Sequence, residues 1–536
     1  MQPSTAAKVL EPQRRRMILV ATCTALMAVV ASASGLNVAQ QQVAEDLDAS
    51  QMTVLWIINS YIVVLAALLL PVGAIADRWG RKPVLMAGLV VFGLASAAAA
   101  FAESSTFLII TRVVAGVGAA MIMPVTLSVI TSSFPAEARA QAIGIWAGVA
   151  GGGGLLGMII AALLTDLASW RWLFALPVLL VAAAFLAGRR SIPNSTERVE
   201  SAFDMIGSVL SIVAVGSLVL AIDRGPEDGW TTLLTLTALL AGVAASAGFA
   251  AWELRCQAPL LDLRTFRDAR LKAGSVTQLF TFGVLAGVFI VLFPYFQAVL
   301  GWSALRSILG LLPMVTPMMA ASALAPIPAK RFGARATMLT GIGLAATGLA
   351  LMAAMVSVDG GYASVLPGML VIGLGMGLTM TPSTEAITSA LPDERQGVAS
   401  AINDTTREVG SALGVALLGA VLAAEYREAI KPLLSSLPER TTDAAGEGIA
   451  RAFTLAAQTR GDEADTLITA ARQAFVDGWA SSMWIGAAAM GGLFVLVFII
   501  GPLRPTSSPP PSMVDAEAGG DDRQLEPAGT GASHSA

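Results

Sequence analysis

Fourteen predominantly apolar stretches, each close to the length that crosses a bilayer, divide this chain from near its start to residue 501. A helix needs roughly 20 such residues to span the hydrocarbon core. The composition agrees, because 55% of the residues are hydrophobic and 13% are charged. Lipid offers no partners for backbone polar groups, so stretches of this length predict helices. The predicted spans are 17–37, 54–72, 84–102, 107–130, 142–164, 172–188, 203–221, 230–251, 271–292, 308–325, 337–358, 363–381, 398–424 and 479–501.

Lysine and arginine are concentrated in alternate loops, and the short loops on the opposite side hold only Arg171, Arg224 and Arg306. Basic loops mark the cytoplasmic side, so the sequence predicts cytoplasmic termini, with an N-terminal segment 1–16. The arginines at 14–16 and the apolar run after them also fit a cleavable signal peptide. Removing that run would reverse the charge bias of every later loop, which favours a first membrane span.

Two segments are predicted to lie outside the membrane. Residues 425–477 form a polar, alanine-rich external connection that we expect to be partly helical. Residues 503–536 are rich in proline, serine, glycine and acidic residues, a composition typical of a disordered tail. The two cysteines lie in unlike surroundings and the single histidine is His534, so we expect no metal site. The sequence contains no phosphate-binding loop, which argues against a process driven by ATP. We also expect no enzymatic activity and no cofactor.

A short basic segment between the second and third spans has an ordered pattern, Gly73-Ala-Ile-Ala-Asp77-Arg78-Trp-Gly80-Arg81-Lys82. An ordinary positive-inside loop explains its cations but neither Asp77 nor the two glycines. This order of residues resembles the signature loop of transporters of the major facilitator superfamily. The resemblance implies that Asp77 and its arginines tie the two halves of the protein together in one conformation. Gly73 and Gly80 would allow close backbone approach there.

Three further stretches resemble the fourteen-span drug:proton antiporter branch of that family, over about residues 15–502. They are Leu55-Trp56-Ile57-Ile58-Asn59-Ser60-Tyr61 in the second span, Arg112-Val-Val-Ala-Gly116-Val-Gly118 in the fourth, and the thirteenth-span segment 397–414 around Asn403-Asp404-Thr-Thr-Arg407-Glu408. The resemblance implies an all-α major facilitator fold. Its six-helix bundles would occupy 17–200 and 271–502, and two extra helices in 201–270 would lie outside them as a linker pair.

The resemblance also implies a function, namely proton-driven efflux of lipophilic, cationic drugs or antiseptics across the bacterial cell membrane by alternating access. Its partners would be drug-like molecules, protons and membrane lipids, with no nucleic acid, and the chain would act as a monomer. Export of one dedicated metabolite or antibiotic is a second hypothesis. Proton-coupled uptake or ligand sensing on the same scaffold is a third.

Charged residues at membrane depth are candidates for the transport site, because they are costly unless they face a cavity or a partner. The candidates are Arg112, Glu385, Asp404 and Glu408, the last two on one helix face. We add Asn37, Asn59, Tyr61 and Trp56 as substrate or coupling positions. The alternatives are an outward-snorkelling Arg112, a structural ion cluster of Asp404, Arg407 and Glu408, and an interfacial Glu385.

Three departures from the pattern of these antiporters concern the first half of the chain. Ser32 stands where the first-span pattern has an aspartate, and Asn59 stands where the second-span pattern has one. The fifth span keeps its glycines at 151–154 but lacks the following proline. The membrane-embedded acids should therefore be those of the second half, Glu385 and Asp404.

Overall fold

The computed structural model describes residues 11–194, 203–435, 437–459 and 461–500. Within these ranges all regular structure is helical, and 14 helices are long and apolar enough to cross a membrane. The predicted all-α membrane fold is thereby confirmed, while the predicted tail 503–536 lies outside the described residues. The first six spans are α1 (Pro12–Gly35), α3 (Gln51–Trp79), α4 (Arg81–Ala99), α5 (Ser105–Ser133), α6 (Ala136–Leu167) and α7 (Ala175–Ser191), the last preceded by η1 (Trp170–Phe174).

Eight further spans follow, several with short helices between them. The seventh and eighth are α8 (Met205–Asp228) and α9 (Leu233–Glu253). The ninth to fourteenth are α10 (Ala269–Pro294) with the π-helix η3 (Tyr295–Val299), α11 (Ala304–Gly310) with α12 (Leu312–Leu324), α14 (Ala334–Met355), α15 (Gly361–Thr388), α16 (Gln396–Leu433) and α19 (Asp462–Ile500). The connecting helices are α2 (Gln40–Asp46), η2 (Leu263–Arg267), α13 (Pro326–Phe332), η4 (Asp393–Arg395), α17 (Glu439–Ala445) and α18 (Ile449–Gln458).

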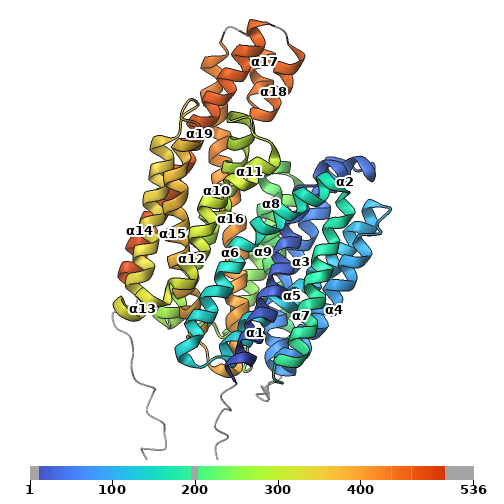
Figure 1. Cartoon of the computed structure of the whole chain (residues 1–536), viewed down its shortest axis with the longest axis vertical. Helices are drawn as coiled ribbons and strands as arrows, with labels where there is room; N and C mark the ends of the chain where they lie inside the picture. The colour runs from blue at the N-terminus through green and yellow to red at the C-terminus, as the bar shows by residue number, and fades with distance from the viewer. Residues whose placement is uncertain (1–10, 195–202, 436, 460, 501–536) are drawn as a thin grey trace, which may run out of the picture. The chain divides into compact units, whose positions relative to one another are not determined.

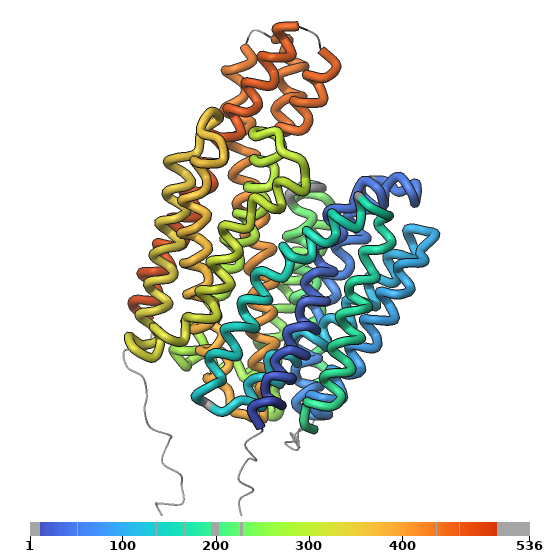
Figure 2. Tube along the Cα trace, viewed as in Figure 1, coloured from blue at the N-terminus to red at the C-terminus, as the bar shows by residue number. Residues whose placement is uncertain are grey.

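The helices of each half pack mainly with one another. In the first half α5 packs against α3 and α4, and α1 packs against α6 and α7. In the second half α10 packs against α16, and α14 packs against α15 and α19. Figure 2 shows the blue-to-teal first half and the yellow-to-red second half on opposite sides of the membrane-spanning body. Helix α8 contacts α3 of the first half and α16 of the second, and α9 packs on α8.

Close approach of the helices depends on small residues, as is usual where lipid leaves no hydrophobic drive between spans. A side chain at Gly118 of α5 would place its Cβ 2.6 Å from the backbone nitrogen of Phe92 in α4. Along α6, a Cβ at Gly157 would lie 2.6 Å from Cα of Ala31 in α1. The glycines of α6 therefore allow close packing, and α6 runs as one helix through this stretch.

The two ends of the body differ in charge. One end, which we call the basic end, carries Arg78, Arg81, Arg139 and Lys330, together with the start of α1 and helix α13 (Figure 1). Helices α17 and α18 stand at the opposite end, above the extended ends of α16 and α19 (Figure 1). The predicted connection 425–477 is thus mostly helical, and Tyr426 anchors it by donating to the carbonyl of Ala445 at 3.1 Å.

Three boundary predictions differ from the structure. Helix α1 begins at Pro12, inside the segment expected to precede the first span, and proline suits the first turn of a helix. The predicted loop around Asp77 is a single break at Gly80, whose φ of 102° interrupts otherwise continuous helix. Arg224, expected in an external loop, lies inside α8 and is fully buried, because α8 extends beyond its apolar run along α3.

Candidate functional site

Asp77, in the last turn of α3, joins the two halves of the protein at the basic end. Its Oδ1 accepts the backbone N–H of Gly397 at 2.7 Å and its Oδ2 accepts that of Val398 at 3.0 Å. These are first-turn N–H groups of α16, which have no partner within the helix and lie at its positive end. A buried carboxylate therefore caps α16 from the other half of the chain.

Arg81 and a pair of glycines complete this contact. The Nη2 of Arg81 lies 3.4 Å from Oδ1 of Asp77 and donates to the carbonyl of Asp393 at 2.6 Å. A Cβ at Gly73 would lie 2.5 Å from the carbonyl oxygen of Gly397, so the two backbones touch directly. The sequence expectation of close approach at Gly73 thus has a physical counterpart, whereas Gly80 is needed for its positive φ.

The remaining cations of the motif have other partners. Lys82 donates to the carbonyl of Arg189 at 2.9 Å, a contact within the first half. Arg78 lines a recess with Asp204 and Leu260, which border the linker helices α8 and α9. The motif therefore contacts three structures at once, namely α16, the end of α7 and the ends of the linker segment.

Two other contacts between the halves lie at the same end. Ser322 of α12 donates to the carbonyl of Gly144 in α6 at 3.0 Å, and a Cβ at Gly144 would lie 2.5 Å from the carbonyl of Ser322. Lys330 donates to the carbonyl of Glu137 at 3.2 Å. Together with the Asp77 contact, they join the two halves at the basic end in this structure.

The acids of α16 lie in the interior of the protein. Asp404 is fully buried, and its Oδ1 accepts from Asn403 at 3.0 Å and pairs with Arg407 at 3.4 Å. Its Oδ2 is buried and has no hydrogen-bond partner among the described residues. Because a buried carboxylate oxygen normally has a partner, this oxygen is a natural place for a proton or a cation.

The Arg407 guanidinium connects this acid to both halves. It lies 4.2 Å from the ring centroid of Phe282 in α10 and 5.4 Å from that of Trp146 in α6. Glu408 follows on α16 and is half-buried, within electrostatic reach of Arg407 and of Tyr61 in α3. The segment 404–408 therefore faces the first half from the second.

A buried amide network that the sequence reasoning missed holds this region together. Gln278 of α10 donates to Oδ1 of Asn403 at 2.8 Å and to Thr384 of α15 at 3.0 Å. Ser383 donates back to Oε1 of Gln278 at 3.0 Å. The sequence did indicate such a network, because Gln278 places an amide side chain in an otherwise apolar span. Polar residues in membrane helices usually have partners.

Glu385 follows Thr384 and is half-buried near the end of α15. The cations whose charge acts on it are Arg139 and Lys330 of the basic end. Thr384 donates to Asn403 at 3.1 Å, so the helix segments that carry Glu385 and Asp404 meet through neighbouring residues. The structure brings together the segments of these two predicted acids, and Glu385 is the one closer to the basic end.

Arg112 is enclosed in the first half. It is 1% exposed, its Nη1 donates to Oγ of Ser32 at 3.0 Å and its Nε donates to the carbonyl of Ile57 at 3.3 Å. Its guanidinium carbon lies 4.1 Å from the centroid of Tyr61, whose hydroxyl donates to Val29 at 3.0 Å. The guanidinium thus points into the helix core and not outward to the membrane surface.

The other first-half candidates are separated. Asn37 is exposed and hydrogen-bonds only locally, to Ala33 at 3.4 Å and from Gln40 at 3.3 Å, as far as the described contacts go. Asn59 instead donates to Oδ2 of Asp223 in α8 at 2.5 Å. Trp56, on the same helix as Asn59, lies under the guanidinium of Arg224 with 4.4 Å between the guanidinium carbon and the ring centroid.

Sequence reasoning also missed Asp223 and Arg224 as members of this region. Both were taken to lie beyond the seventh span, because the apolar run ends near Ala221. Two consecutive charges in the last turns of a membrane helix were the available signal.

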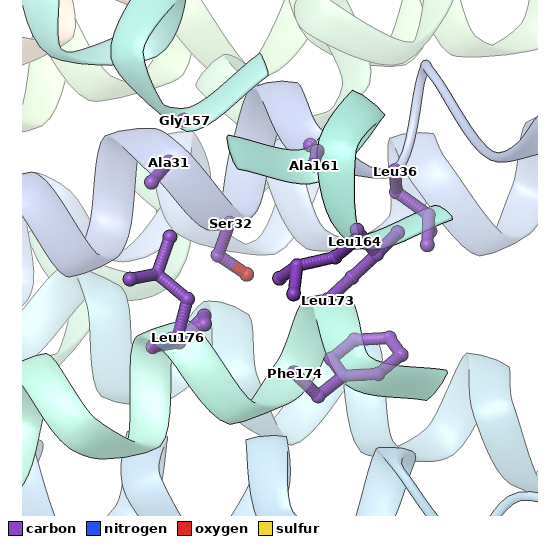
Figure 3. Close-up of a pocket in the computed structure, with 11 residues that line it drawn as sticks. Ala31, Ser32, Leu36, Gly157, Ala161, Leu164, Leu173, Phe174 and Leu176 are labelled. Atoms are coloured by element: carbon purple, nitrogen blue, oxygen red, sulfur yellow. The ribbon is translucent and has the colours of Figure 1, made fainter. Parts of the chain in front are cut away.

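A recess in the first half lies beside Ser32, between α1, α6 and the start of α7 (Figure 3). Its walls are apolar, with Leu36, Leu164, Leu173 and Phe174 around the Ser32 hydroxyl. Since Ser32 is the acceptor for Arg112, this recess lies one side chain away from the buried guanidinium.

The described residues hold 14 helices long and apolar enough to cross a membrane, packed in two halves with charged residues buried between and within them, and they define a multi-pass membrane protein of the transporter type. The chain belongs to the Major Facilitator Superfamily, whose family model matches residues 20–415. The resemblance predicted from the motifs is thereby confirmed.

Several relatives are similar over most of the chain. The multidrug efflux pump LfrA of Mycolicibacterium smegmatis is 33% identical over 446 residues, covering 83% of this chain and 88% of that protein. The tetracenomycin C resistance and export protein of Streptomyces glaucescens is 31% identical, covering 90% of each chain. The methyl viologen resistance protein SmvA of Salmonella typhimurium is 30% identical, covering 91% of this chain and 97% of its own.

Solved structures agree on the fold. The human organic anion transporter MFSD10 matches with a TM-score of 0.59 at 14% identity, covering 91% of this chain and 100% of that one. The proton:xylose symporter XylE matches with a TM-score of 0.58 at 13% identity, covering 92% and 97%. At such identities these likenesses describe the architecture alone.

Proposed function

We propose that this protein exports lipophilic organic cations across the bacterial cell membrane, driven by the proton gradient. The observation that carries the proposal is the buried Asp404, whose Oδ2 has no partner within the described residues and whose Oδ1 is shared by Asn403 and Arg407. A carboxylate in this position can bind either a proton or a cation, so that binding of one releases the other. Relatives named for multidrug efflux and methyl viologen resistance support a cationic cargo.

The contact of Asp77 with α16 serves as the gate of this transport cycle. Asp77, Arg81 and Gly73 hold α3 against the start of α16, which keeps the basic end closed. With the basic end in the cytoplasm, the present arrangement is the one that releases cargo to the outside. Opening requires Asp77 to give up both backbone donors of α16, so the gate has two discrete states.

The domain arrangement that we propose follows the packing of the helices. Six-helix bundles at 17–200 and 271–502 would rock about the central site, as repeated transporter halves do. The segment 201–270 would act as a linker, with α8 beside both halves through α3 and α16. Both termini would be cytoplasmic, and the protein would work as a monomer surrounded by lipid.

Export of one dedicated antibiotic is the second candidate function. It is favoured by the similarity to the tetracenomycin C resistance and export protein, which covers 90% of each chain. The two functions differ in the breadth of their cargo. A dedicated exporter would protect against one compound of a chemically diverse panel, whereas a multidrug exporter would protect against many.

The test is a susceptibility and efflux panel in a bacterium without its own pumps. We expect the protein to lower accumulation of ethidium, methyl viologen and tetraphenylphosphonium, and a protonophore to abolish the effect. Asp359→Asn, which changes an exposed carboxylate at the end opposite the basic end, is the matched control and should export normally. Protection against one antibiotic alone would select the second function, and accumulation above the empty strain would indicate uptake.

A further inference from the structure

Two charged residues of α8 lie against α3 near the end opposite the basic end. Asp223 is half-buried and Arg224 is fully buried, both within the span Met205–Gly225. Asn59 of α3 donates its Nδ2 to Oδ2 of Asp223 at 2.5 Å. A charge in the last turn of a span can normally reach water, so the burial of Arg224 against α3 calls for a physical account.

One face of α3 is matched to this pair of charges. Met52, Trp56 and Asn59 are spaced three or four residues apart and therefore share a face. The Arg224 Nη1 lies 2.7 Å from Sδ of Met52, and its guanidinium carbon lies 4.4 Å from the centroid of the Trp56 ring. An aromatic face, a carboxylate and an orienting amide thus meet between the two helices.

This combination suits an organic cation. The face of tryptophan attracts cations, most strongly where water is excluded. The Asp223 carboxylate, held by Asn59 one helical turn along α3 from Trp56, supplies the opposite charge, which acts more strongly where the dielectric constant is low. In this structure the ring of Trp56 already bears a planar cation, the buried guanidinium of Arg224, so the ring face is placed where it holds an organic cation.

We propose that α3 and α8 form a subsite for organic cations, in which Asp223 supplies the counter-charge, Trp56 the aromatic face and Asn59 the amide that orients the carboxylate. An arriving cation exchanges with the Arg224 guanidinium over the ring. The inference deepens the proposed export function and rests on it for its place in a transport cycle. It also places a negative charge one hydrogen bond from Asn59, the position at which the second-span pattern has an aspartate.

The first test is equilibrium binding of tetraphenylphosphonium to the purified full-length protein. Asp223→Asn removes the charge but keeps groups that can hydrogen-bond with Asn59, and we expect the Kd to rise roughly tenfold. The control Asp359→Asn should leave the Kd unchanged. Moving the charge back, in the double variant Asn59→Asp with Asp223→Asn, should restore the Kd to within about threefold of the unaltered protein.

Three results would overturn the subsite. They are no binding of tetraphenylphosphonium to the unaltered protein, an unchanged Kd in Asp223→Asn, or a double variant as weak as Asp223→Asn. In the last case Asp223 would act by packing and hydrogen bonding at its own position. A melting temperature measured for each variant separates that role, because a structural loss would lower it in parallel with binding.

Export from inverted vesicles separates this inference from the proposed function. If the unaltered protein binds tetraphenylphosphonium through Asp223 but does not transport it, the export function is wrong and the subsite stands. If the unaltered protein exports it and Asp223→Asn changes neither binding nor export, the subsite is wrong and the export function stands. We expect Asp223→Asn to slow tetraphenylphosphonium export about as much as it weakens binding, and a neutral dye much less.

Discussion

Asp77 accepts a hydrogen bond from the backbone N–H of Gly397 at 2.7 Å, across 320 residues of chain. The bond ties the end of the second span to the start of the thirteenth, and the same carboxylate also takes the N–H of Val398. The donors are the otherwise unpaired N–H groups of a helix start. One side chain thereby couples the positions of α3 and α16, which is what a two-state gate requires.

The first prediction concerns this carboxylate. Asp77→Asn leaves one oxygen for the two N–H donors and turns an amide N–H₂ toward the other, so the closed basic end should weaken by about 1.5–3 kcal/mol. We expect ethidium export to fall several-fold while its Kd stays within about twofold, because the gate holds no cargo. Equal losses of binding and export in purified protein would contradict this role. Glu394→Gln, an exposed neighbour at the same end, is the control.

The second prediction concerns the glycine contact at the same gate. Gly73→Ala places a Cβ 2.5 Å from the carbonyl oxygen of Gly397, and the helices must separate at a cost of about 1–3 kcal/mol. A cysteine in place of Lys330, in a chain freed of Cys23 and Cys256, should then react faster with a maleimide. Gly419→Ala on α16 has nothing within 4 Å of the added Cβ and should leave the rate unchanged. Equal rates in both variants would mean that the contact does not hold the end closed.

Much of the fold was available from the sequence, because spanning-length apolar runs have few alternatives in lipid. The ordered Gly73–Lys82 pattern likewise pointed to the contact that Asp77 makes. What the sequence concealed were contacts between helices distant in the chain. In the sequence, each of three polar residues stands alone in or beside a span, namely Gln278, Asp223 and Arg224. Their partners are Asn403, Asn59 and Trp56 respectively, and they lie on helices distant in the chain.

Arg224 shows why the predicted end of the seventh span was wrong. Hydropathy ended the seventh span near Ala221, since two charges follow directly. The helix continues because α3 offers Trp56 and Met52 as a cover for the guanidinium and Asn59 as a donor for the carboxylate. A local average cannot register partners of this kind.

The third prediction concerns pH at the end opposite the basic end. The indole N–H of Trp170 donates to Asp46 at 3.0 Å and Arg171 pairs with the same carboxylate, and both lower the pKa of Asp46 below its ordinary value of 3.8. A lowered pKa means that the contact stabilises the fold above that ordinary value and is lost as the pH falls through the lowered one. The melting temperatures of Asp46→Asn and the unaltered protein should therefore differ at pH 7 and converge as the pH falls through the lowered pKa, below 3.8. Glu45→Gln should follow the unaltered protein throughout, and a constant difference at all pH values would exclude the ionic origin.

The last prediction concerns the buried acids of the second half. Glu385→Gln removes a half-buried carboxylate whose neighbouring cations Arg139 and Lys330 can still be solvated at the basic end, so the protein should fold normally. Asp404→Asn instead removes the paired charge of the buried Arg407 and leaves only Glu408 within electrostatic reach, so the melting temperature should drop. Asp404→Glu keeps the charge and should recover most of that stability.

Both neutral variants, Glu385→Gln and Asp404→Asn, should slow export of ethidium more than export of a neutral dye. A cation loses its counter-charge as well as the coupled proton, whereas a neutral cargo loses the proton alone. The measurement is efflux of the two dyes in inverted vesicles over a range of external pH. If ethidium efflux and its pH dependence survive in both Glu385→Gln and Asp404→Asn, once the rate of Asp404→Asn is corrected for the amount of folded protein, the two acids are structural and coupling resides elsewhere.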